Sequence, residues 1–189
     1  MSSNKVIIFS APSGSGKTTL VKYCLKEFPQ LKFSVSATTR KPRGEEKHGK
    51  DYFFFSVEDF KNKIKNHEFI EYEEVYPDKF YGTLKAEVDK IWANRQVVIF
   101  DVDVVGGKNL KSIFKNQALS IFIAPPSIEE LENRLIKRKT EDEKSIQMRV
   151  EKAEKELEYA KFFDKVIVND DLEVAQKELH QLISEFLNQ

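Results

Sequence analysis

The residues best suited to do chemistry form one run near the amino terminus, Ala11–Pro12–Ser13–Gly14–Ser15–Gly16–Lys17–Thr18. A glycine-rich loop that ends in Lys–Thr and opens a helix presents successive backbone N–H groups, an ammonium and a hydroxyl to one point. Such a P-loop binds the phosphates of a nucleoside triphosphate, with Lys17 on the β- and γ-phosphates and Thr18 on Mg²⁺. The residues expected to contact the triphosphate are Ser13, Gly14, Ser15, Gly16, Lys17, Thr18 and Thr19.

The loop departs from the pattern G-x-x-x-x-G-K-S/T at its first position, where Ala11 stands in place of glycine. The Cβ of alanine disfavours a positive φ but is otherwise small enough to fit. A Gly/Ser-rich turn that happens to precede a lysine is the alternative interpretation. The predicted strand Val6–Ser10 before the loop and the helical pattern Thr19–Glu27 after it favour the P-loop.

A carboxylate that could complete a magnesium site follows the apolar run Val97–Phe100. Asp101 stands where a buried strand would deliver an acid to the ion, and we expect the contact to pass through water. Asp103 follows two residues later, and we expect it on the same face of the strand. Because any strand can end in aspartate, this assignment depends on the P-loop.

A basic segment, Ser36 to Arg43, could hold a second phosphate. The guanidinium groups of Arg40 and Arg43 can each bind a phosphate in bidentate fashion, and the Pro42 between them stiffens their spacing. A solvated basic loop is the alternative that the segment alone leaves open.

Four short apolar runs predict strands buried on both faces, as in a parallel sheet flanked by helices. They are Val6–Ser10, Val97–Phe100, Leu119–Ala124 and Val166–Val168. Helical patterns lie between them, so the chain is expected to be α/β. Ser127–Glu130 has the spacing of a capping box for a helix to about Lys139, and Thr140–Glu143 offers a second one before the charged stretch ending near Phe162.

Between Asp51 and Thr83 the alternation breaks, which predicts an inserted, partly antiparallel unit. Its expected elements are strand Tyr52–Phe55, helix Val57–His67 and strands Phe69–Val75 and Lys79–Thr83 around Pro77–Asp78. The charged span Arg134–Arg149, with its two capping signals, predicts helices hinged near Thr140.

Length and composition narrow the classes of protein. The 189 residues suit one domain, and 31 basic against 31 acidic residues remove the electrostatic argument for a nucleic-acid or anionic-membrane partner. Cys24 is the sole cysteine and is expected to pack as a small hydrophobe in a reducing compartment. No apolar run approaches the roughly 20 residues of a spanning helix. We therefore expect a cytoplasmic protein.

With Gly49–Tyr52 and Phe69–Tyr72 added to the arginine segment, the chain resembles the guanylate kinase family from end to end. The resemblance implies a P-loop NTPase core with a parallel sheet flanked by helices, a mixed α/β GMP-binding unit and a helical lid. The whole chain, 1–189, would be a single domain. The implied core is 1–35, 84–126 and 163–189, the GMP-binding unit about 36–83 and the lid about 127–162.

The resemblance also implies which residues bind GMP. They are Ser36, Arg40, Arg43, Tyr52, Glu71, Tyr81, Thr83 and Asp103. Arg40, Arg43 and Tyr52 would hold the phosphate, and Glu71 would read the base. Guanine presents N1–H and N2–H₂ as adjacent donors, which an ionised carboxylate accepts, whereas adenine offers an acceptor at N1.

In the carboxyl-terminal half, the resemblance assigns Arg134, Arg138 and Arg149 to the lid, where they reach the phosphates of ATP. Lys139 replaces the family's usual glycine, and Asn169 and Asp170 would border the ATP base. The implied catalytic residues are Lys17, Arg43, Arg138 and Arg149. The accepting phosphate oxygen is already anionic, so no general base is needed, and His48, His67 and His180 are expected at the surface.

The expected activity is transfer of the γ-phosphoryl group of ATP to GMP, with Mg²⁺ as cofactor. One alternative is a guanylate-kinase-like protein-binding module without catalysis, against which the intact Gly16, Lys17 and Thr18 argue. Another is a kinase for a different phosphorylated acceptor, against which Glu71 argues. The expected partners are GMP and ATP, with no nucleic acid and no membrane, and a homodimer is left open.

Overall fold

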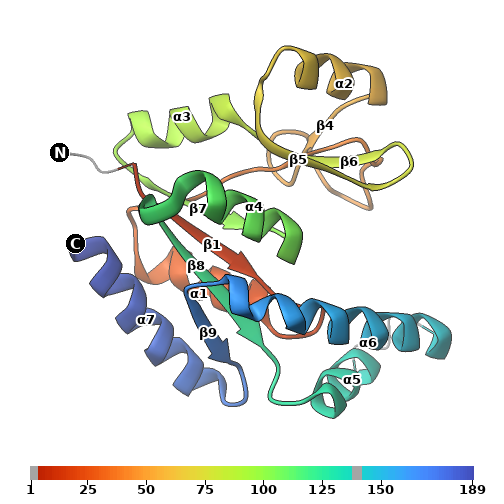
Figure 1. Cartoon of the computed structure of the whole chain (residues 1–189), viewed down its shortest axis with the longest axis vertical. Coiled ribbons are helices and arrows are strands. Elements are labelled where there is room, and N and C mark those ends of the chain that lie inside the picture. Colours follow the sequence, from red (N-terminus) through yellow and green to blue (C-terminus); the bar gives the residue numbers. More distant parts are fainter. Residues whose placement is uncertain (1–3, 138–141) are drawn as a thin grey trace.

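The centre of the fold is a parallel sheet whose strands bring their carboxyl ends to one edge. The computed structural model describes residues 4–137 and 142–189. In spatial order the strands of the sheet are β2 (Leu31–Phe33), β7 (Val97–Asp101), β1 (Val6–Ser10), β8 (Ala118–Ala124) and β9 (Lys165–Val168). Every neighbouring pair is parallel, and the arrows of β1, β8 and β9 point the same way (Figure 1). The predicted α/β fold with a parallel sheet is confirmed.

Helices cover both faces of this sheet because its side chains alternate between them. Ile7 and Phe9 of β1 belong to a buried cluster with residues of α1 and α7, whereas Val6 and Ile8 pack in a second cluster with residues of α3 and α4. These helices are α1 (Lys17–Glu27), α7 (Leu172–Asn188), α3 (Lys85–Ala93) and α4 (Val104–Phe114), which continues into η1 (Lys115–Gln117). Cys24 of α1 is buried in the first cluster, as expected.

The predicted burial on both faces is wrong for β9. This strand lies at the end of the sheet, and while Ile167 packs in the cluster that contains α7, its neighbours alternate onto the uncovered face. Val166 and Val168 are 44% and 51% exposed.

A second, mixed sheet lies beside the first (Figure 1). Its strands in spatial order are β4 (Phe53–Phe54), β3 (Ala37–Thr38), β6 (Lys79–Leu84) and β5 (Phe69–Tyr76), and it is accompanied by α2 (Val57–Lys65). The β5–β6 hairpin turns at Pro77–Asp78, as predicted, with Asp78 in the left-handed region at φ 59°. Phe60 of α2 packs against Phe69 and Phe80. The short strands β2 and β3 were not predicted, since two or three residues carry no periodicity.

Two further helices, α5 (Ile128–Lys137) and α6 (Glu143–Leu157), pack against each other, and α6 runs into η2 (Glu158–Phe162). Ser127 Oγ accepts the Glu130 N–H at 3.1 Å, which confirms the predicted cap. α6 begins at Glu143, and the residue that caps it is Asp142, whose carboxylate accepts the Ser145 N–H at 2.7 Å. Thr140, like the predicted end of α5 at Lys139, lies outside the described residues. No helix within the described ranges is long and apolar enough to cross a bilayer.

Candidate active site

A cavity of about 560 Å³ lies among the carboxyl edge of the parallel sheet, the mixed sheet and α6. In open α/β sheets, this edge is where ligands bind. The cavity takes residues from segments far apart in the sequence, among them Lys17, Tyr52, Glu71, Asp101, Asp103, Arg149 and Glu156. It therefore joins the predicted triphosphate site to the predicted GMP site.

The P-loop connects β1 directly to α1, as predicted. Gly14 and Gly16 have φ values of 101° and 89°, which side chains rarely adopt. A Cβ at Gly14 would also lie 3.3 Å from the side chain of Leu135, so the loop packs closely under α5. Ala11 is buried and is not among the described residues with positive φ, so the alanine fits where the pattern has glycine.

Lys17 and Asp101 meet at the cavity, where the lysine ammonium forms an ion pair with the carboxylate and donates to Val102 O at 2.9 Å. Thr18 lines the same cavity and is exposed to it. A hydroxyl and a carboxylate are hard oxygen donors, and Mg²⁺ in nucleotide sites takes one or two such groups together with water and substrate phosphates. The residues present therefore fit a magnesium–nucleotide site.

Asp103 does not share a strand face with Asp101, contrary to our expectation. The strand ends at Asp101, and Asp103 caps α4 by accepting the Gly106 N–H at 2.7 Å. Its backbone carbonyl accepts the hydroxyl of Ser10 at 2.9 Å, which ties this position to the residue before the P-loop. Asp103 still lines the cavity, but through a helix cap.

Glu71 lies on β5 where the strand faces the cavity, and its Oε1 accepts the Thr83 hydroxyl from β6 at 2.8 Å. Burial raises the pKa of the Glu71 carboxyl from 4.5 to about 7, since the Thr83 hydrogen bond opposes the shift only in part and the charges of Asp103 and Glu73 add to it. The carboxyl that was expected to read the base therefore gains and loses its proton near neutral pH.

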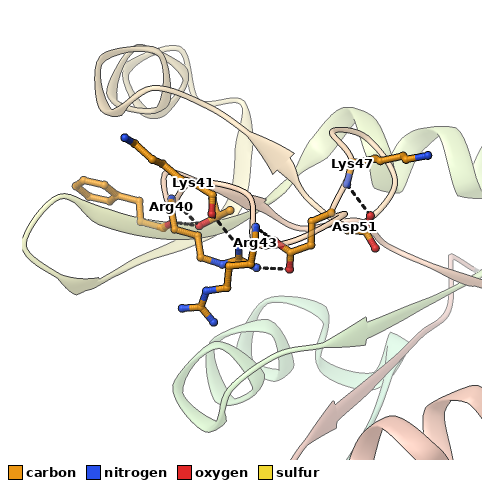
Figure 2. A network of polar contacts seen from close by, with 8 residues as sticks. Arg40, Lys41, Arg43, Lys47 and Asp51 are labelled. Atoms are coloured by element: carbon orange, nitrogen blue, oxygen red, sulfur yellow. Dashed lines mark hydrogen bonds and ion pairs between the residues drawn. The ribbon is translucent and has the colours of Figure 1, made fainter. Parts of the chain in front are cut away.

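The arginine segment takes part in a network of polar contacts with residues of the loop that follows it (Figure 2). Arg40 makes a bidentate ion pair with Glu46, with N···O distances of 2.6 and 2.7 Å, and its guanidinium lies 4.7 Å from the ring centre of Tyr52. Glu46 also accepts the Arg43 N–H at 2.8 Å. The hydrogen bond from Arg40, followed by that from the Arg43 N–H, lowers the pKa of Glu46 to about 2. The side chain of Arg43 is exposed and does not line the cavity.

Ser36, Tyr52 and Tyr81 line the cavity near this network. The rings of Tyr52 and Tyr81 meet edge to face with centres 6.2 Å apart. Burial raises the pKa of Tyr52, which keeps its hydroxyl protonated and able to donate to an anion. Thr83 is buried and acts on the cavity through its hydrogen bond to Glu71.

Of the two predicted lid arginines that the structure describes, one lines the cavity and the other does not. Arg149 of α6 lines the cavity and donates to Ser13 Oγ of the P-loop at 2.8 Å. Arg134 of α5 instead donates to the Asn169 carbonyl at 3.0 Å and to Glu130 at 3.0 Å. Arg138 lies outside the described residues.

Neither residue expected at the ATP base lines the cavity. Asn169 is 6% exposed, and its side-chain amide donates to the Ser15 carbonyl at 2.8 Å. Asp170 is exposed.

Several residues of the site were not predicted from the sequence. Glu73 follows Glu71 on the same face of β5, which strand alternation could have shown. Lys152 and Glu156 follow Arg149 at helical spacing on α6, and all three line the cavity. Glu46 gives no signal in the sequence, because it reaches Arg40 through an irregular loop.

Fold and site together define a P-loop nucleotide-binding protein whose cavity also takes residues from the mixed sheet and from α6. The family model described as guanylate kinase matches residues 3–186. The chain therefore belongs to the guanylate kinase family.

Individual relatives agree with this assignment. The chain is 58% identical over 183 residues to the guanylate kinase of Bacteroides fragilis, covering 97% of this chain and 90% of that one. It is 46% identical over 188 residues to the guanylate kinase of Salinibacter ruber, covering 100% of both. Among solved structures, the guanylate kinase of Anaplasma phagocytophilum is similar at a TM-score of 0.73 and 29% identity, over 96% of this chain and 85% of that one.

Proposed function

We propose that the protein transfers the γ-phosphoryl group of ATP to GMP, giving ADP and GDP, with Mg²⁺ as cofactor. The observation that carries the proposal is the composition of one cavity. A P-loop with Lys17 and Asp101 lines one part of it, and Glu71 with Asp103 lines another. Two phosphate-bearing substrates could therefore be bound in this cavity at the same time.

The donor is held by the P-loop in this proposal. The helix N-terminus at Lys17 has no side-chain cap, which suits the phosphates of ATP as its polar partner. Thr18 and, through water, Asp101 would hold Mg²⁺, which screens the charge of the triphosphate. The ion pair with Asp101 holds the ammonium of Lys17 at the cavity, and there it would contact the β- and γ-phosphates.

The acceptor is recognised by its base and its phosphate. Glu71, supported by Thr83, presents carboxylate oxygens to the adjacent N–H donors of guanine. Arg40 and Tyr52, with Ser36 and Tyr81 nearby, would contact the GMP phosphate.

Catalysis of this transfer depends on alignment of the two substrates and on positive charge around the phosphoryl group, more than on proton transfer. The attacking phosphate oxygen is anionic, and the transition state spreads charge over the transferred phosphoryl oxygens. We assign the stabilising cations as Lys17 and Arg149, which line the cavity, together with Arg138 and Arg43. His48, His67 and His180 are all exposed, as expected from the sequence.

The same proposal divides the chain into a core (1–35, 84–126 and 163–189), a GMP-binding unit (about 36–83) and a lid (about 127–162). The cytoplasmic location and a homodimer stay predictions from the sequence. A protein-binding module without catalysis has no observation in its favour, since the P-loop lysine and the cavity are both present.

A coupled assay of ADP release tests the function with GMP, AMP, UMP and CMP as acceptors. We expect turnover with GMP and Mg²⁺, and its loss on addition of EDTA. Lys17→Ala should reduce turnover by orders of magnitude, whereas Lys22→Ala, an exposed position on the same helix, should not. Equal turnover of AMP, or full activity of Lys17→Ala, would contradict the proposal.

A further inference from the structure

Asn169 is a buried polar residue that the active site, as described so far, does not use. It follows β9 directly, and its backbone N–H donates to the Ala124 carbonyl at the end of β8 at 2.8 Å. Its side chain, 6% exposed, donates from Nδ2 to the Ser15 carbonyl of the P-loop at 2.8 Å. The residue is therefore fixed to the sheet at one end and to the P-loop at the other.

The hydrogen bond sets the orientation of one peptide plane in the phosphate cradle. In a trans peptide the C=O and the N–H of the next residue point in opposite directions. Because the Ser15 carbonyl points to Asn169, the Gly16 N–H points away from it. Gly16 lines the cavity and Asn169 does not, so this N–H is directed to the cavity side.

Packing around Gly16 shows how tightly the two groups are matched. A Cβ at Gly16 would lie 2.2 Å from Asn169 Nδ2, a distance that real Cβ atoms do not show. The φ of 89° at Gly16 also favours glycine. Gly16, the second glycine of the P-loop pattern, therefore leaves space for Asn169 on one side and for the expected phosphates on the cavity side.

Asn169 also connects the P-loop to α5. Its backbone carbonyl accepts from Arg134 Nη1 at 3.0 Å, and Arg134 is held in turn by Glu130 at 3.0 Å. A chain of hydrogen bonds therefore runs from α5 through Asn169 to the Ser15 carbonyl.

We propose that Asn169 is a positioning residue of the P-loop, which orients the Ser15–Gly16 peptide for the phosphates of the donor, and that its side chain does not read the adenine base. The proposal rests on the function proposed above, because it assumes that the P-loop binds ATP. In this proposal the hydrogen bond from Asn169 to Ser15 supports binding of the triphosphate of ATP and not binding of its base.

Binding of a ligand without a base separates the two roles of Asn169. Calorimetric titrations with magnesium tripolyphosphate, MgATP and GMP should be made on the wild-type protein, on Asn169→Ala and on the exposed control Asn109→Ala. In Asn169→Ala the Ser15 carbonyl loses its donor, so tripolyphosphate and ATP should both weaken by about tenfold, as for one buried unpaired group. GMP affinity should stay within about twofold of wild type, which also reports an intact fold.

A second variant, Asn169→Asp, keeps the side-chain volume and gives a pH signature. An ionised carboxylate cannot donate to the Ser15 carbonyl, whereas a protonated carboxyl can. Relative to wild type at each pH, tripolyphosphate binding by Asn169→Asp should be weak at pH 8 and recover as the pH falls toward 5. Simple support of the fold would give no such recovery.

Three results would overturn the proposal. Weaker binding of ATP with unchanged tripolyphosphate binding in Asn169→Ala would show that the side chain reads the base. Unchanged binding of both ligands, in Asn169→Ala or in Asn169→Asp at pH 8, would make the hydrogen bond irrelevant to the cradle. A wild-type protein that binds neither ligand would refute the proposed function as well, and is thereby distinguished from the first two results.

Discussion

Replacing Glu71 with glutamine should stabilise the protein without ligand while it weakens binding of GMP. The carboxyl of Glu71 has its pKa raised from 4.5 to about 7, chiefly because the cavity wall buries it. Glutamine keeps the volume and an oxygen that can accept the Thr83 hydroxyl, but it carries no charge to bury.

The size of the effect follows from the pKa. Below pH 4.5 the carboxyl is protonated in both the folded and the unfolded chain and costs nothing. Between pH 4.5 and about 7 the unfolded chain releases the proton first, so the stability of the wild-type protein falls as the pH rises. Above pH 7 the difference is complete, and at about 1.4 kcal/mol per pKa unit it amounts to about 3 kcal/mol.

Thermal unfolding of the apoprotein at pH 5 and pH 8 measures this difference. At pH 8 the midpoint of Glu71→Gln should exceed that of wild type by up to about 6–12 °C, and at pH 5 the gap should shrink to about a quarter of that. Glu74→Gln is a matched control, since Glu74 is exposed on the same strand.

Binding of GMP should show the opposite preference. Guanine requires the ionised carboxyl, so GMP affinity of the wild-type protein should fall about tenfold for each pH unit below 7. In Glu71→Gln the affinity should be low throughout, with only the titration of the GMP phosphate near pH 6 remaining. Equal unfolding midpoints at pH 8, together with wild-type GMP affinity, would refute the reasoning about Glu71.

Two further variants test the cations of the site by steady-state kinetics. Arg149→Ala should lower kcat by about 10³–10⁵-fold with little change in KM for GMP, because the contact to the phosphoryl group is made mainly in the transition state; a change in KM alone would make Arg149 a ground-state binding residue. Glu46→Gln should raise KM for GMP about two- to fivefold, because Arg40 loses the bidentate partner that orients it. A lower KM would show instead that Glu46 competes with the GMP phosphate for Arg40.

Local features of this protein were predictable from the sequence. The P-loop is one contiguous run between a strand and a helix, so its chemistry and its position at the end of β1 followed from neighbouring residues. The hairpin at Pro77–Asp78 and the cap at Ser127 are likewise set within a few residues. Such features depend on backbone conformations that the local residue types favour.

The sequence by itself thus determined the longer elements and the chemical groups offered to a nucleotide, whereas the tertiary structure decided the short strands β2 and β3 and the environment of those groups. Glu71 has a raised pKa chiefly because folding buries its carboxyl in the cavity wall, and the charge of Asp103, which the cap of α4 brings close, adds to the shift. Asn169 reaches the P-loop across 154 residues of sequence. Burial and charge act through space, so their effect on a side chain is set by residues that the chain brings together only when it folds.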